Sequence, residues 1–372
     1  MRHSLMATTA ALAATSLLAA CGGSPTATPA SGGADEKATK AEKVYEKYNA
    51  MSGQERQDEL VELAEKEGQL DVYTSNTDMD DLVEGFTELY DIEVNVYRAN
   101  SESVLQRLLQ ETKAEYYGAD IFETNALELG VVNQEGLLYP YEGELRDKVR
   151  EEGKADGWTA SRFNSFVVGW NTDLVPPGEE PKSVEELAEP KWKGKVSMEV
   201  GDVDWFTAMY DYYVANGKTE AEAEDLMTRI AANSKIAKGH TVQGELLSAG
   251  QFAVTVSSYS HTIDKAADKG APVSWKPADG DPVQPIVIRP NGIGMLKTAA
   301  HPAAAMLFVD YELSGGQKVF ADAFRVGSIA GGADPLEGLE VVPVPEEKLL
   351  EDPTTWNELY EKVVRNGQEI SS

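Results

Sequence analysis

Strand-like and helix-like patterns alternate along most of this chain from about residue 52, and this alternation is the strongest constraint on its fold. Residues 70–74 and 92–96 have the short apolar or alternating character of strands. Between them, apolar side chains recur at helical spacing from Met79 to Tyr90. A repeated strand–helix order is typical of α/β proteins, so we expect that class, with largely parallel sheets.

The same patterns place the other main elements. Ser52 is expected to cap a helix that runs to Glu67 and stops at Gly68, and Ser103 to begin another helix as part of a capping box with Gln106. Further strands are expected at residues 119–123, 166–170, 195–200, 251–256 and 284–288. Later helices are expected after His301 and after Asp352.

The N-terminus has the three parts of an export signal. Arg2 supplies positive charge, and the apolar run behind it is too short to span a bilayer. That run ends in Leu18-Ala19-Ala20-Cys21-Gly22, which resembles the lipobox of bacterial lipoproteins. We therefore expect residues 1–20 to be removed as a signal peptide and Cys21 to carry a lipid anchor, the alternative being an ordinary signal with an incidental cysteine.

Residues 21–51 are predicted to be a lipidated cysteine followed by a flexible tether. Gly, Ser, Thr, Pro and Ala dominate residues 22–40, and such a composition cannot form a core. Because Cys21 is the only cysteine, no intramolecular disulfide can form.

Charge and motifs exclude several classes of function. The formal net charge is −30, from 63 acidic and 33 basic residues, which leaves no general basic surface for nucleic acid. H-E-x-x-H, Walker A, G-x-G-x-x-G and G-x-S-x-G motifs are absent from the sequence. We therefore expect a protein that is not an enzyme and needs no cofactor.

Five segments together resemble one family. They are residues 65–77, 118–141, 158–172, 181–198 and 289–320, of which 181–198 (PKSVEELAEPKWKGKVSM) is the most specific. In this order they resemble the solute-binding proteins of bacterial ABC importers, in the branch that binds ferric ion and related organic ligands. The resemblance covers residues 55 to about 330.

The resemblance implies a two-lobe α/β protein that binds its ligand in a cleft between the lobes and closes by hinge motion. Lobe one would comprise residues 52–157 plus 283–340, lobe two residues 158–282, and a helical tail residues 341–372. The implied protein is a monomer, anchored by lipid at the extracytoplasmic face of the cell membrane. Its partners would be a small-molecule ligand and a membrane permease.

Polar residues that follow predicted strands are the candidates for the cleft, because ligands of open α/β sheets bind outside the carboxyl ends of strands. Backbone N–H groups at helix starts, hydroxyls and an arginine suit an anion, and an aromatic side chain suits an amine. Each of these residues also has a structural interpretation, as a helix cap, a surface ion pair or a core residue. The candidates are Ser75, Asn76, Thr77, Asn125, Ser161, Arg162, Trp205, Thr241, Ser257 and Tyr259.

Tyr259 decides between two kinds of ligand. The ferric-binding members of the family use two consecutive tyrosines after the strand that here ends at Val256, and phenolates suit hard Fe³⁺. This chain has Tyr259 alone, between Ser258 and Ser260. We therefore expect an organic ligand with an anionic group, and keep ferric iron, with Tyr259 as one ligand, as the alternative. A secreted hydrolase or an adhesin-like lipoprotein is the alternative from another class.

Overall fold

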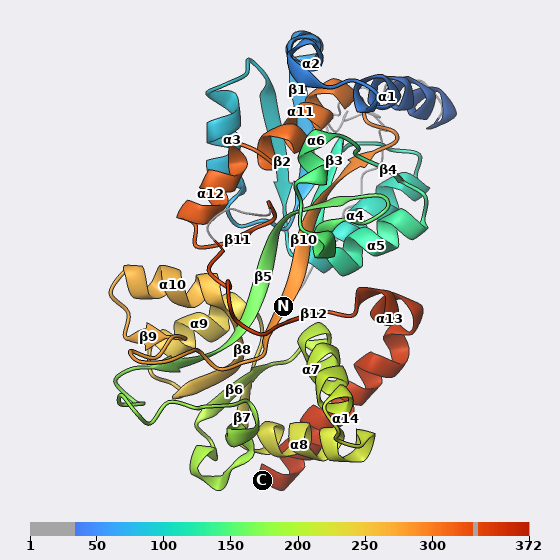
Figure 1. Cartoon of the computed structure of the whole chain (residues 1–372). Coiled ribbons are helices and arrows are strands. Elements are labelled where there is room, and N and C mark those ends of the chain that lie inside the picture. The colour runs from blue at the N-terminus through green and yellow to red at the C-terminus, as the bar shows by residue number, and fades with distance from the viewer. Residues whose placement is uncertain (1–33, 330–333, 372) are drawn as a thin grey trace, which may run out of the picture. The chain divides into compact units, whose positions relative to one another are not determined.

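The computed structural model describes residues 34–329 and 334–371, so the predicted signal peptide, Cys21 and the start of the tether lie outside the described residues. Within them, twelve strands form one mixed sheet with the main order β2-β1-β3-β10-β5-β8-β6-β7 (Figure 1). The strands are β1 (Gln69–Thr74), β2 (Glu93–Arg98), β3 (Ile121–Asn125), β4 (Leu138–Tyr139), β5 (Thr159–Asn171), β6 (Val196–Glu199), β7 (Ser234–Ala237), β8 (Val254–Tyr259), β9 (Val273–Ser274), β10 (Ile286–Leu296), β11 (Val326–Gly327) and β12 (Val341–Pro343).

Helices follow most of the strands, as the alternating pattern predicts. They are α1 (Ala34–Asn49), α2 (Gly53–Glu67), α3 (Met79–Thr87), α4 (Ser101–Lys113), α5 (Ala126–Gln134), α6 (Glu144–Asp147), α7 (Val203–Ala215), α8 (Glu220–Ala232), α9 (His240–Ser248), α10 (Ser260–Asp268), α11 (Pro302–Glu312), α12 (Gly316–Asp322), α13 (Glu346–Glu351) and α14 (Pro353–Ser371). Asn100, three residues before the expected Ser103, caps α4, because its Oδ1 accepts the Ser103 N–H at 2.8 Å.

Two long antiparallel strands connect two groups of parallel strands. β1 pairs in parallel with β2 and β3, and β6 pairs in parallel with β7 and β8. Between these groups, β10 pairs antiparallel with both β3 and β5, and β5 pairs antiparallel with β8 (Figure 1). The chain therefore passes twice between the two parallel groups, through β5 and through β10.

β5 and β10 are longer than their apolar patterns predict, which places buried polar residues in the middle of the sheet. The expected strand at 166–170 begins seven residues earlier, at Thr159, and every residue of β5 is buried. The added stretch includes Ser161, Arg162 and Asn164, whose polarity hides it from a pattern based on apolar side chains. Such buried polar groups need partners inside the protein, and those partners form the candidate site.

Separate apolar clusters support each parallel group. Around β1, the helices α2, α3 and α11 contribute Leu60, Phe86 and Phe308, with Phe86 and Phe308 in edge contact at 5.1 Å. Around β6, the helices α7, α8 and α14 contribute side chains such as Phe206 and Tyr360, whose ring centroids lie 5.2 Å apart. The C-terminal helix α14 is therefore part of a core.

Helix α1 replaces much of the expected tether. Ala41, Tyr45 and Tyr48 are at most 2% exposed and pack into the cluster around β1. Their spacing of four and three residues puts them on one face of the helix. We expected a flexible tether as far as residue 51, but residues 34–49 form a packed helix. The lysine and glutamate residues between the three buried positions hide the helical spacing of the buried side chains in the sequence. None of the described helices is long and apolar enough to cross a membrane.

Candidate functional site

The ends of β1 and β3 lie side by side and share hydroxyl and carboxylate contacts. Ser75 Oγ lies 2.8 Å from Thr124 Oγ1. Asn76 Nδ2 donates to Glu123 Oε1 at 3.0 Å, and the guanidinium of Arg162, from β5, forms a short ion pair with the same oxygen. The fully buried Glu123 therefore links two predicted site residues, Asn76 and Arg162. An acidic residue inside an apolar strand pattern was the signal in the sequence for this position.

A second set joins β3, β8 and β10 through Arg289. Its Nη2 donates to Tyr259 OH at 2.7 Å and to Asn125 Oδ1 at 3.2 Å, and its Nη1 pairs closely with Asp204. Asn291 Nδ2 donates to the same Asn125 oxygen at 2.7 Å. The structure thus brings together Asn125 and Tyr259, both predicted, around an arginine that sequence reasoning missed. Arg289 directly follows the strand expected at residues 284–288, and this position was the signal in the sequence that could have found it.

A third set surrounds Asp78 at the start of α3. Arg325 Nε lies 2.7 Å from Asp78 Oδ2, and Lys265 Nζ from α10 lies 2.6 Å from Oδ1. Burial alone would raise the pKa of Asp78, but these two cations lower it below its ordinary value. Arg325 also donates to Thr77 Oγ1 at 2.8 Å, and its Nη1 lies 3.2 Å from His261 Nδ1. Predicted Thr77 is exposed and borders this set.

Tyr259 sits between two imidazoles. Its ring centroid is 3.9 Å from that of His240 and 5.4 Å from that of His261, with the second pair stacked. Burial raises the pKa of the Tyr259 phenol well above its ordinary value, and the cation of Arg289 only partly opposes this. The phenol is therefore protonated at neutral pH, and its ring is one wall of the site.

His240 is held by a buried carboxylate. Its Nε2 lies 2.8 Å from Asp202 Oδ1, and the hydroxyl of Ser257 donates to the other oxygen of Asp202. Burial by itself lowers the pKa of His240, but the charge of Asp202 and its hydrogen bond raise it above the ordinary value. Predicted Ser257 is 1% exposed, so its side chain orients Asp202 from within the protein.

Of the remaining predicted residues, Trp205 and Thr241 lie apart from these contacts, and Ser161 borders the first set. Trp205 is 2% exposed and packs in the apolar cluster around β6. Thr241 is exposed in the first turn of α9, whose N-cap is Gly239. Ser161 is fully buried, and its Oγ accepts a hydrogen bond of 3.3 Å from Arg162.

Two helices that begin at the site start without a side-chain cap. Asn125 is the N-cap of α5 and Tyr259 that of α10, and neither side chain makes a capping hydrogen bond. Side-chain caps are present at α4, from Asn100, and at α8, from Thr219, whereas α2, α3, α7 and α9 also begin without one. First-turn N–H groups carry partial positive charge, so uncapped helix starts beside Arg289 suit a negatively charged group.

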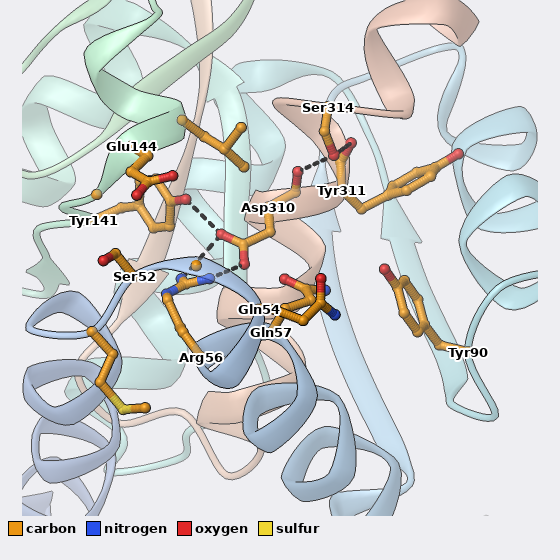
Figure 2. A pocket seen from close by; sticks show the side chains of 14 residues that line it. Ser52, Gln54, Arg56, Gln57, Tyr90, Tyr141, Glu144, Asp310, Tyr311 and Ser314 are labelled. Atoms are coloured by element: carbon orange, nitrogen blue, oxygen red, sulfur yellow. Dashed lines mark hydrogen bonds and ion pairs between the residues drawn. The ribbon is translucent and has the colours of Figure 1, made fainter.

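A different pocket, of about 390 Å³, lies between α2, the end of α11 and the loop at Tyr141 (Figure 2). None of the predicted site residues lines it. Arg56 Nη2 donates to Asp310 Oδ1 at 3.2 Å, and Tyr141 OH donates to the same oxygen at 2.5 Å. Because these buried groups satisfy one another, the pocket floor ties α2 to α11 and offers a ligand no open charge.

Two parallel strand groups connected by β5 and β10, with polar side chains gathered at the strand ends, define a two-lobe binding protein with an inter-lobe cleft and hinge crossings. The chain belongs to the family of bacterial extracellular solute-binding proteins, whose family model matches residues 81–326.

Known relatives agree with this class. The chain is 26% identical over 265 residues to "Iron uptake protein A1" of Synechocystis, covering 66% of this chain and 71% of that protein. Iron-bound HitA of Pseudomonas aeruginosa has a similar fold (TM-score 0.63, 18% identity, 82% of this chain and 99% of that one). So does fructose-6-phosphate-bound AfuA of Actinobacillus pleuropneumoniae (TM-score 0.66, 18% identity, 80% and 99%).

Proposed function

We propose that this protein captures a small organic ligand with an anionic group and delivers it to the permease of an ABC importer. The observation that carries the proposal is the position of Arg289, which contacts both Asn125 and Tyr259 at the uncapped starts of α5 and α10. A guanidinium and two helix N-termini favour an anion, while the ion pair with Asp204 already balances part of the charge of Arg289.

An unpaired donor supports the same ligand class. In the described structure, Arg289 Nε is buried without a hydrogen-bond partner. A buried donor without a partner is costly, so a ligand oxygen that accepts from it stabilises the complex.

Ferric iron is the second candidate, because the relative with 26% identity is an iron uptake protein and Tyr259 follows the corresponding strand. Two features of the site weigh against it. The phenol of Tyr259 resists ionisation, and the guanidinium of Arg289 lies 2.7 Å from its oxygen. A cation bound at that oxygen would be repelled by Arg289 unless an anion binds with it.

The contacts of the 257–262 cluster favour binding without chemistry. Ser257 donates to Asp202, and His261 faces Arg325 and Thr262, so neither forms the Ser–His pair of a hydrolase. We further propose that the protein acts as a monomer at the extracytoplasmic face of the membrane, held by a lipid on Cys21. We place the lobe boundaries near residues 158 and 283, with the tail from residue 341 on.

A thermal-shift screen followed by calorimetry tests the proposal. The probes are phosphorylated sugars, phosphonates, polyamines, thiamine and Fe³⁺ with phosphate or citrate. We expect an anionic organic compound to raise the melting temperature, and Arg289→Met to weaken its binding at least about tenfold, the loss of one charge-assisted contact. Arg229→Met, at an exposed ion pair on α8, is the matched control and should bind normally.

Iron titration provides the opposing result. A visible tyrosinate-to-iron charge-transfer band that disappears in Tyr259→Phe would reject the organic ligand in favour of ferric iron.

A further inference from the structure

We propose that Asp71, Asp120 and His301 form a binding site for a first-row divalent metal ion such as Zn²⁺, separate from the ligand cleft. Asp71 lies near the start of β1, Asp120 directly before β3, and His301 directly before α11. The cleft residues follow the opposite, carboxyl ends of β1 and β3. The inference therefore does not depend on which ligand the cleft binds.

The three side chains have the spacing that a metal ion requires. One ligand atom from each lies within 4.8 Å of the others. His301 Nδ1 is 2.8 Å from Asp120 Oδ2 and 3.7 Å from Asp71 Oδ2. Zinc bonds of about 2.0–2.2 Å in tetrahedral geometry put neighbouring ligands about 3.3 Å apart, which these two distances bracket.

Other hydrogen bonds already hold the two carboxylates in place. Asp120 Oδ1 accepts the backbone N–H groups of Ala300 and His301, at 2.7 and 3.0 Å, so it caps the start of α11. Asp71 accepts side-chain amide N–H groups from Gln69 at 2.8 Å and Asn95 at 3.1 Å. Contacts of this kind orient metal ligands in proteins and strengthen binding.

The charge around the site favours a cation. Glu67 Oε2 accepts the Ala304 N–H at 2.9 Å, which adds a third carboxylate at the start of α11. No lysine or arginine forms an ion pair with these carboxylates among the described residues; His301 is the one partner of that kind.

Metal binding needs the Nδ1 lone pair of His301. A neutral imidazole loses its Nδ1 proton to solvent and takes one up at Nε2, so the ring stays neutral while Nδ1 binds the metal together with Asp120 Oδ2 and Asp71 Oδ2. Water completes the shell from the open side, since the side chains of His301 and Asp71 are 20% and 24% exposed. One imidazole nitrogen and two carboxylate oxygens suit Zn²⁺, Co²⁺ or Ni²⁺.

A similar cluster in the other group of strands is less suited. Glu199, Asp202 and His240 also meet the distance condition. The two oxygens of Glu199, however, accept backbone N–H groups from Gly201 and Gly239, and Asp202 is shared between His240 and Ser257. The side chains of His240 and Asp202 are 13% and 3% exposed, against 20% and 24% for His301 and Asp71, so that cluster leaves less access for the water that would complete a metal shell.

The experiment titrates the purified chain with Zn²⁺ against a chromophoric chelator, and with Co²⁺ while recording visible absorption. We expect one site per chain, occupied by Zn²⁺ and by Co²⁺ alike. His301→Gln and Asp71→Asn should each weaken binding at least about tenfold. Asp225→Asn, which removes a carboxylate from an exposed ion pair on α8, is the matched control and should leave binding unchanged.

Three results would overturn the proposal: no binding by the unmodified chain, unchanged binding in both site variants, or a loss that appears in His240→Gln instead. Circular dichroism establishes that each variant is folded. If His301→Gln does not fold, Asp71→Asn decides alone, because Asp71 is part-exposed and its amide replacement keeps the shape of the side chain.

Discussion

Lys265 Nζ lies 2.6 Å from Asp78 Oδ1, so an ion pair joins α10 to the start of α3. The other oxygen of Asp78 binds Arg325 Nε at 2.7 Å. One buried carboxylate thus holds two cations from distant parts of the sequence, in segments that we assign to different lobes. Because its two partners differ in exposure, the two halves of this contact contribute unequally to stability.

Arg325→Met should destabilise the protein much more than Lys265→Met. The Arg325 side chain is 6% exposed, and its removal leaves the buried Asp78 with one part-exposed partner, at a cost of about 3 kcal/mol. The Lys265 side chain is 32% exposed, so solvent screens its charge and the loss should be under about 1 kcal/mol. Urea denaturation measures both changes, and equal losses would contradict this account of Asp78.

His240 should make stability depend on pH in the neutral range. The Asp202 carboxylate raises the pKa of His240 above 6.5 in the folded state, against the opposing effect of burial. A raised histidine pKa stabilises the fold fully below pH 6.5 and loses this contribution as pH rises through the folded-state value. The difference in unfolding free energy between the unmodified chain and His240→Gln should therefore shrink above pH 6.5. A difference in unfolding free energy that grows with pH would contradict a raised pKa of His240 in the folded state.

Gly292→Ala should disrupt the pairing of β5 and β10. A Cβ atom there would lie 2.4 Å from Trp158 Cε3 and 2.8 Å from the backbone oxygen of Thr159. The backbone cannot yield easily at this point, where the register of the two strands shifts between Asn291 and Gly292. We expect a loss of about 2–3 kcal/mol by urea denaturation.

Gly315→Ala is the comparison for Gly292→Ala. Its new Cβ would meet only the ring of Tyr311, at 3.2 Å. A loss as large in this variant would show that added volume in general, and not the close approach of β5 and β10, causes the effect.

The sequence predicted the fold class because apolar spacing reports which face of each element is buried. It predicted less of the site, because the site forms where neighbouring strands of the sheet bring together residues that are far apart in the chain. Asn125 and Tyr259 follow strands, and both come together in the structure. Arg289, which contacts both, met the same rule, since it follows the strand expected at residues 284–288; the actual strand β10 continues past it to Leu296.

Strands that carry buried polar residues are a second feature that the sequence pattern did not predict. The polar first part of β5 has no apolar alternation, so the strand was predicted at less than half of its length. Ser257 was expected to face a ligand because it follows a strand pattern, yet it lies inside β8 and its hydroxyl binds Asp202. Whether such a hydroxyl faces a cleft or a neighbouring side chain depends on strand order, which one sequence does not specify.

Helix α1 should contribute to the stability of the domain as part of its core. Tyr45 is fully buried, its hydroxyl donates to the backbone oxygen of Leu296 at 3.1 Å, and its ring lies 5.1 Å from that of Tyr139. Tyr45→Ala should cost about 3–5 kcal/mol, the range for emptying an aromatic site. Tyr45→Phe keeps the ring, loses one buried hydrogen bond, and should cost about 1 kcal/mol. Lys43→Ala, at the exposed face of the same helix, should change little. Urea denaturation ranks the three variants, and a neutral Tyr45→Ala would return residues 34–49 to the role of a tether.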